Sequence, residues 1–194
     1  MAAVAMLLGA CSLGSIVGGS PPATYDLQAP SMEKIRSARN SQLSIGIPIA
    51  IRTIDTEEIL VKASDGRVSY FSGVAWGDRL PRLFQARLAQ AFENSGSFRA
   101  VLTSQDRVTG DISLAIEIRD FEVETQAGGS EAVVDVYVKV VDEHGSTVVG
   151  TKRFQERTRV AGTEPPAGIQ ALNTTFQKVA SDIVGWVSQR RGQA

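Results

Sequence analysis

The clearest pattern in the chain is an alternation of apolar with small or polar residues over residues 43–54. Every second position from Leu43 to Ile51 is a leucine or an isoleucine. A period of two predicts a β-strand that buries one face. Pro48 falls on the opposite face and has no backbone N–H to donate, so we expect an edge strand or a β-bulge at this point.

Several further strands are expected downstream. Asp65-Gly66 separates short apolar runs at residues 59–61 and 68–70, which is typical of a β-hairpin because glycine accepts the positive φ of the turn. A short strand is expected at residues 98–102. Three longer alternating runs, joined by short turns, then predict an antiparallel meander over residues 112–123, 134–140 and 148–156. The alternation slips by one residue at Arg119-Asp120, which predicts a β-bulge.

Two stretches carry apolar residues at helical spacing. The first covers residues 78–96, where we expect Asp78 to cap the helix and Gly96 to end it. The second covers residues 164–191, and Arg190 and Arg191 suit the negative end of its dipole. The sequence therefore predicts an α+β fold, in which a largely antiparallel β-sheet packs against two amphipathic helices.

The N-terminal segment is uncharged over residues 1–19, and it holds the only cysteine of the chain. Leu8, Gly9 and Ala10 precede Cys11, an order that resembles the signal of bacterial lipoproteins. That resemblance implies cleavage between Ala10 and Cys11 and a lipid on the Cys11 thiol, anchored by about 0.8 kcal/mol for each buried methylene. The alternatives are a membrane-spanning helix, an ordinary signal peptide, and a cysteine that merely lies in an apolar segment.

These features predict a lipoprotein signal peptide at residues 1–10, the lipidated cysteine with a flexible tether rich in Gly, Ser and Pro at residues 11–24, and one domain at residues 25–194. No Lys or Arg precedes Cys11, although signal peptides begin with positive charge, so we expect a truncated signal. Ser12 follows the cysteine. In the lipoprotein sorting rule that this order resembles, Asp at that position retains the protein at the inner membrane, whereas Ser allows export to the outer membrane.

Composition narrows the chemistry that the chain can perform. A net charge of -1 gives no basic surface for nucleic acid. One Cys and one His exclude an internal disulfide and the usual multi-histidine metal sites, so we expect neither a metal nor a cofactor.

No catalytic constellation stands out from the sequence. His144 lies in a predicted turn, and the carboxylates Asp120, Glu122 and Glu124 are expected on a solvated strand face. The chain contains neither the G-x-S-x-G pattern of a nucleophile elbow nor a P-loop. We therefore expect a protein that is not an enzyme.

Two further stretches follow the Leu8-Gly9-Ala10-Cys11 segment: YDLQAP, residues 25–30, and GVAWGDRLPRLFQARLAQAFENSGSFRAV, residues 73–101. Together the three resemble the ABC-type transport auxiliary lipoprotein family, which includes the lipoprotein of the paraquat-inducible Pqi system. The resemblance covers nearly the whole chain after the tether. It implies an accessory subunit that works with an MCE-domain periplasmic protein, an ABC permease and an ATPase in moving lipids between the two membranes. The implied location is the periplasmic face of the outer membrane, and self-association is left open.

Three residues of the second stretch are candidates for contact with a partner: Trp76, Arg79 and Arg82. A packing role for Trp76 and a solvated helix surface for the arginines are the alternatives. Two other functions remain open at this point: a lipoprotein of outer-membrane assembly or lipopolysaccharide transport, and a periplasmic enzyme.

Overall fold

The computed structural model describes residues 21–35 and 39–189. Its helices are α1, Leu80–Ser95, and α2, Pro165–Gln189. Its strands are β1 (Ala23–Tyr25), β2 (Arg39–Ile45), β3 (Ile49–Ala50), β4 (Leu60–Ala63), β5 (Val68–Tyr70), β6 (Val74–Trp76), β7 (Phe98–Thr103), β8 (Ile112–Gln126), β9 (Gly129–Asp142) and β10 (Thr147–Arg159). The expected signal peptide with Ala10, the lipid site Cys11, and the arginines Arg190 and Arg191 lie outside the described residues.

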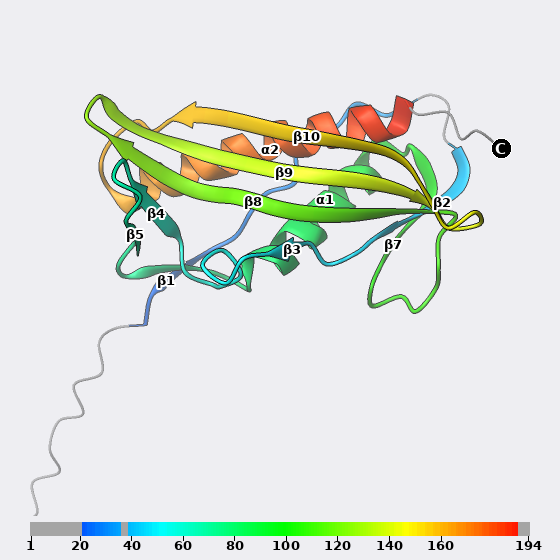
Figure 1. Ribbon diagram of the computed structural model, residues 1–194, viewed down its shortest axis with the longest axis horizontal. Helices are drawn as coiled ribbons and strands as arrows, with labels where there is room; N and C mark the ends of the chain where they lie inside the picture. Colours follow the sequence, from blue (N-terminus) through cyan, green and yellow to red (C-terminus); the bar gives the residue numbers. More distant parts are fainter. Residues whose placement is uncertain (1–20, 36–38, 190–194) are drawn as a thin grey trace, which may run out of the picture.

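The fold has two layers, with both helices behind one curved sheet (Figure 1). The main sheet has the order β10-β9-β8-β2-β7, and β3 and β4 add to β8. Helix α2 packs over β9 and β10, and α1 packs against β7 and α2. Phe84 of α1 meets Phe176 of α2 edge-on, with ring centroids 5.1 Å apart. The expected α+β fold is confirmed, and the side of the sheet away from the helices is called the outer face below.

The meander of β8, β9 and β10 is antiparallel, as predicted. Its register shifts between Ile118 and Asp120, which confirms the bulge at Arg119. The strands from the first half of the chain instead pair in parallel: β2, β3 and β4 with β8, and β2 with β7. Alternation of apolar residues does not encode strand direction, so the sequence pattern could not indicate these parallel pairs.

The predicted strand at residues 43–54 is interrupted around Pro48. Ile45 pairs with Leu114 on β8, and the next pair joins Ile49 to Glu117. From Ile45 to Ile49 the chain advances four residues, while β8 advances three, from Leu114 to Glu117. One extra residue reverses the face to which the following side chains point.

This reversal decides which isoleucines are buried. Leu43 and Ile45 lie in the core, as expected. Ile47, Ile49 and Ile51 are 47%, 67% and 64% exposed, so the prediction of a single buried face is wrong for them. The physical reason is the extra residue, which turns Ile47 and Ile49 to the outer face, and Ile51 lies beyond the end of β3.

The ends of α1 differ in how well the sequence predicted them. Gly96 ends the helix in the left-handed region with φ 60, as expected. Asp78 was expected to be the N-cap, but Arg79 holds that position and no side chain caps the helix. The Asp78 carboxylate instead accepts the Arg79 backbone N–H at 2.7 Å, one residue too early to cap the helix.

Strand β1 pairs in parallel with β6, and Tyr25 lies opposite Trp76. Ala23 and Thr24, which the sequence placed in the tether, therefore belong to the folded domain. The pairing brings together the two stretches that carry the family resemblance, although about fifty residues separate them along the chain.

The outer face carries a network of charges where β4 meets β8. Lys62 Nζ lies 2.8 Å from Glu122 Oε1, 3.7 Å from Asp120 Oδ1 and 4.0 Å from Glu124 Oε1. A solvated face was expected for these carboxylates, but the Glu122 side chain is only 2% exposed, so that prediction is wrong for Glu122. Burial raises the pKa of Glu122, although the hydrogen bond from Lys62 opposes the change.

The loop between β7 and β8 packs against β2 at Gly110. A methyl group on Gly110 would lie 2.8 Å from the carbonyl oxygen of Gln42 and 2.7 Å from Ser44 Oγ. We predict that Gly110→Ala lowers the free energy of unfolding by about 1–3 kcal/mol, because backbone must shift to admit the side chain. Gly128→Ala is the control, since nothing lies within 4 Å of its added methyl, and it should change the free energy by less than about 0.5 kcal/mol. Equal stability of both variants by urea denaturation would contradict this packing.

The buried carboxylate of Glu122 should make stability depend on pH. Between the ordinary Glu pKa, about 4.3, and the raised pKa of Glu122, the unfolded chain releases a proton that the folded protein retains. Stability of the wild type should therefore fall, relative to Glu122→Gln, as pH rises through this window. Urea denaturation of both proteins across the acid range measures the difference, and a constant or oppositely sloped difference would refute the prediction.

Lys62→Met serves as the second variant in that comparison. It removes the hydrogen bond that lowers the pKa of Glu122, so that pKa should rise further. The loss of stability with rising pH should then extend to a higher pH than in the wild type. At neutral pH the variant should lose about 1–2 kcal/mol, because a buried carboxylate is left without its donor.

Candidate functional site

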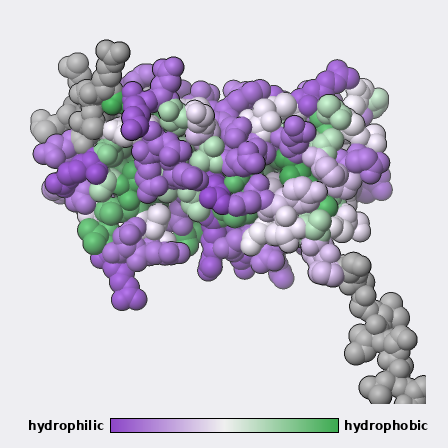
Figure 2. Space-filling model, turned by 180° about the vertical axis from the view of Figure 1, so that it is seen from behind, coloured by the Kyte–Doolittle hydropathy of each residue, from purple (hydrophilic) through white to green (hydrophobic). Residues whose placement is uncertain are grey.

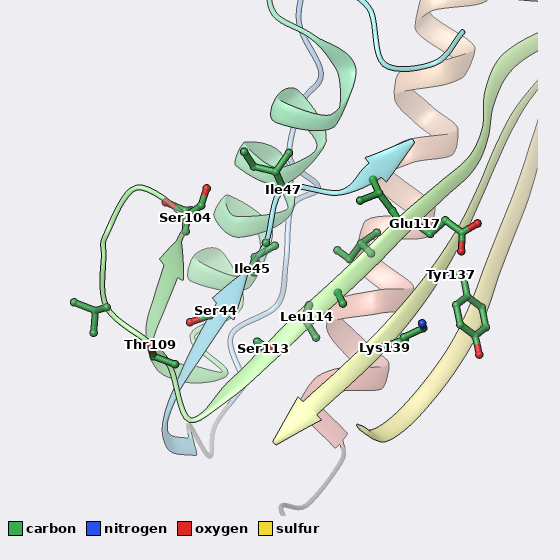
Figure 3. Close-up of a pocket in the computed structure, with 16 residues that line it drawn as sticks. Ser44, Ile45, Ile47, Ser104, Thr109, Ser113, Leu114, Glu117, Tyr137 and Lys139 are labelled. Carbon is green, nitrogen blue, oxygen red and sulfur yellow. The ribbon is translucent and has the colours of Figure 1, made fainter. Parts of the chain in front are cut away.

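A groove of about 470 Å³ opens on the outer face of the sheet. Strands β8 and β9 form its floor, and the connection from β2 to β3 and the loop from β7 to β8 form its walls. Figure 3 shows Ser104 and Thr109 on the loop, Ile47 on the connection, and Tyr137 and Lys139 on β9. Three segments that are distant in the sequence therefore build one concave surface.

The walls of the groove are aliphatic and unusually exposed. Ile47 and Ile49 come from the interrupted strand, and Val108, 56% exposed, comes from the loop. Ala115 of β8 also lines the groove and is exposed. Ile51, which follows β3, is exposed as well. Contiguous exposed apolar side chains of this kind are typical of a binding surface.

The loop that forms one wall is held by hydrogen bonds at both ends. Asp106 Oδ2 accepts the backbone N–H of Thr103 at 2.6 Å and the Thr103 hydroxyl at 3.0 Å, and these bonds lower the pKa of Asp106. At the other end, the Gly110 N–H donates to Ser44 Oγ at 2.8 Å, and Asp111 exchanges two hydrogen bonds with the backbone of Gln42. The wall is therefore fixed to β2.

Gln85 of α1 connects both walls from inside the core. Its buried amide donates to the carbonyl of Ile45, at the end of β2, at 2.7 Å and to Ser104 Oγ at 3.3 Å. The Gly46 N–H donates to the Leu114 carbonyl on β8. Pro48, two residues later, has no N–H, so it cannot continue this hydrogen-bonding pattern with β8. Gln85 was not among the residues that the sequence pattern singled out, because its only signal is a polar residue on the apolar side of the helix.

Two charged side chains line the groove, Glu117 and Lys139. Glu117 Oε2 lies 3.4 Å from Arg119 Nη2, and the Arg119 guanidinium stacks over the Tyr137 ring at 4.6 Å. Lys139 is exposed and has no ion pair with any of residues 21–35 and 39–189. The groove thus offers aliphatic walls beside one uncompensated positive charge, a combination suited to binding an apolar group that carries an anion.

The three candidate contact residues lie away from this groove. Trp76 is 2% exposed and packs edge-on against Phe121, with centroids 6.1 Å apart, so the structure supports its packing role. Arg79 is exposed and forms an ion pair with Asp55 at 2.7 Å. Arg82 is exposed on the first turn of α1 and forms no ion pair within the described part of the chain.

His144 lies in the turn between β9 and β10, as predicted. Its ring nitrogens are 3.6 Å from Asp142 and 3.7 Å from Asp111. Among residues 21–35 and 39–189, no three His, Cys, Asp or Glu side chains are grouped so that they could hold a metal ion.

The opposite side of the molecule, over the helices, is mainly hydrophilic. Its hydrophobic patches gather toward the end at which β2 and β7 lie (Figure 2). None of the helices in the described residues is long and apolar enough to cross a bilayer.

Comparison with known proteins identifies the family. Residues 25–184 match the family of the ABC-type transport auxiliary lipoprotein component. The protein bll6063 of Bradyrhizobium diazoefficiens is 30% identical over 178 residues, which cover 90% of this chain and 48% of the relative. The chain thus spans about half the length of that relative.

Solved structures share the fold. The crystal structure of protein XCC0632 from Xanthomonas campestris superposes with a TM-score of 0.79 at 23% identity, covering 85% of this chain and 94% of that one. The hypothetical protein CT253 from Chlamydia trachomatis gives a TM-score of 0.51 at 12% identity, covering 77% and 98%. The match over residues 25–184 shows that this chain belongs to the ABC-type transport auxiliary lipoprotein family.

Proposed function

We propose that this protein is a non-catalytic accessory subunit of an MCE-type ABC system that moves lipids between the inner and outer membranes. The observation that carries the proposal is the family match over residues 25–184, together with the lipoprotein-like order Leu8-Gly9-Ala10-Cys11 that precedes it. A lipid on Cys11 anchors the domain to the periplasmic face of the outer membrane. The energy comes from an ATPase on another chain, in keeping with a sequence that has no P-loop.

The anchor acts by position. From Cys11 to the start of β1 at Ala23, the chain spans at most about 40 Å. The domain is thereby confined to a thin layer beside the membrane, where its effective concentration for a periplasmic partner is high. The chain enters the domain at β1, toward one end of its long axis, whereas the loop between β7 and β8 lies toward the other end (Figure 1). The groove can therefore face away from the anchored end.

The partners in this proposal are the MCE-domain protein, the permease and the ATPase, all on other chains. Arg82 is the candidate contact that the structure leaves available, because it is exposed and free of ion pairs in residues 21–35 and 39–189. Arg79 is a weaker candidate, since binding a partner would compete with Asp55 for its guanidinium.

The anchor is tested at Cys11. Cys11→Ala should release the protein from the outer membrane into the soluble periplasmic fraction, because no thiol remains to carry the lipid. Fractionation with immunoblotting, and mass spectrometry of the mature N-terminus, measure the result. Ser12→Ala is the matched control and should remain in the outer membrane. Membrane retention of Cys11→Ala would overturn the anchor.

The destination is tested separately at the next residue. By the sorting rule that this segment resembles, Ser12→Asp should move the lipidated protein to the inner membrane without releasing it. Separation of the two membranes on a density gradient would detect the shift. An unchanged distribution would contradict the proposed outer-membrane location.

Partner contact is tested by charge reversal on α1. Arg82→Glu should reduce the MCE protein recovered with this chain by about fivefold, the effect of a surface charge contact of about 1 kcal/mol. Arg99→Glu, an exposed arginine on β7, is the control. Equal recovery with both variants would exclude Arg82 as a contact, and recovery of an outer-membrane β-barrel in place of the MCE protein would favour the assembly function instead.

A further inference from the structure

We infer that the groove on the outer face holds a single acyl chain of an anionic amphiphile, with the charged head group at Lys139. The inference rests on the proposed function and deepens it, because it names the ligand that this chain would itself bind. It commits to a lipid rather than a protein as the occupant. Three observations on the groove carry it.

The first observation is the chemistry of the walls. Ile47, Ile49 and Val108 present aliphatic carbon to solvent in the walls of the groove, and the small residues Ala115 and Gly46 leave space in its lining. A volume of about 470 Å³ lies in the range of small-ligand sites, about 300–1,000 Å³. A flexible hydrocarbon chain fits such a space without aromatic partners.

The second observation is that three serine hydroxyls around the groove already have hydrogen-bond partners. Ser44 Oγ accepts from Gly110, Ser104 Oγ accepts from Gln85, and the Ser113 hydroxyl donates to Glu143. A ligand in the groove therefore need not supply hydrogen bonds along its length. An acyl chain has none to offer, whereas a peptide backbone would bring N–H and C=O groups that require partners.

The third observation is the charge at the rim. The Glu117 carboxylate is neutralised by Arg119, and Lys139 has no ion pair within the described ranges. Lys139 is therefore the cation of the groove lining that remains available to a ligand. An anionic head group, carboxylate or phosphate, complements it.

The test measures binding by the full chain carrying Cys11→Ala, so that its own lipid cannot compete. The probes are saturated fatty acids of eight to fourteen carbons below their micelle concentrations, followed by calorimetry or by displacement of a fluorescent fatty acid. Each added methylene should tighten binding about fourfold until the groove is full. Primary alcohols of equal length should bind about fivefold more weakly, and Lys139→Met should abolish that difference.

Two pairs of variants locate the site. Ala115→Trp fills the floor and should abolish binding, whereas Gln155→Trp, exposed on the same face but outside the groove, should not. Ile49→Ser should weaken binding about tenfold, whereas Val68→Ser, also an exposed aliphatic residue, should leave it unchanged. All four positions are exposed, and thermal unfolding checks that each variant retains its fold.

Affinity that does not depend on the length of the fatty acid would overturn the inference, and so would undiminished binding by Ala115→Trp. Self-association in ultracentrifugation that Ala115→Trp abolishes would also overturn it, because the occupant of the groove would then be a second copy of the chain. These results leave the proposed function standing, because recovery with the MCE protein is measured separately. Conversely, fatty-acid binding that survives while anchoring and partner recovery fail would refute the proposed function and retain this inference.

Discussion

The arrangement of the whole fold depends on a sheet that is covered by helices on one side only. The inner face packs against α1 and α2, and a continuous apolar core fills the space between the layers. The outer face must be compatible with water along strands as long as β8 and β9. It achieves this mainly with charged side chains, as at Lys62 and Glu122, where a buried carboxylate is tolerated because an ammonium group lies 2.8 Å away.

The groove arises where this division of faces is broken. The extra residue between Ile45 and Ile49 turns aliphatic side chains to the outer face, where they cannot reach the core. Such an irregularity would leave the Ile45 carbonyl unpaired, but the Gln85 amide reaches it from α1. A helix in the covered layer thus stabilises the distortion that forms the groove on the uncovered side.

The sequence predicted the elements better than it predicted their faces. Both helices, the meander and the bulge at Arg119 followed from periodicity, because each is a local pattern that repeats over many residues. The exposure of Ile49 did not follow, because the added residue leaves the alternation in the sequence intact but reverses the face of the sheet to which the later side chains point. The burial of Glu122 also escaped, because its cover comes from Lys62, sixty residues earlier in the chain. The candidate groove depends on such long-range pairings, and its residues carry no motif.

The residues that carry the family likeness and those that line the groove lie in different parts of the fold. Tyr25 and Trp76 meet in the small β1–β6 sheet, near the start of α1, where the chain enters the domain. Trp76 is buried there against Phe121, so a match to these stretches reports the packing of the fold. The chemistry of the groove instead depends on the step between β2 and β3. A protein that kept both stretches but lost the extra residue there would keep the core and bury Ile49, and the outer face would close into an ordinary strand pair. Within this fold, the stretches that carry the family likeness and the step that forms the groove are therefore separate segments of the sequence.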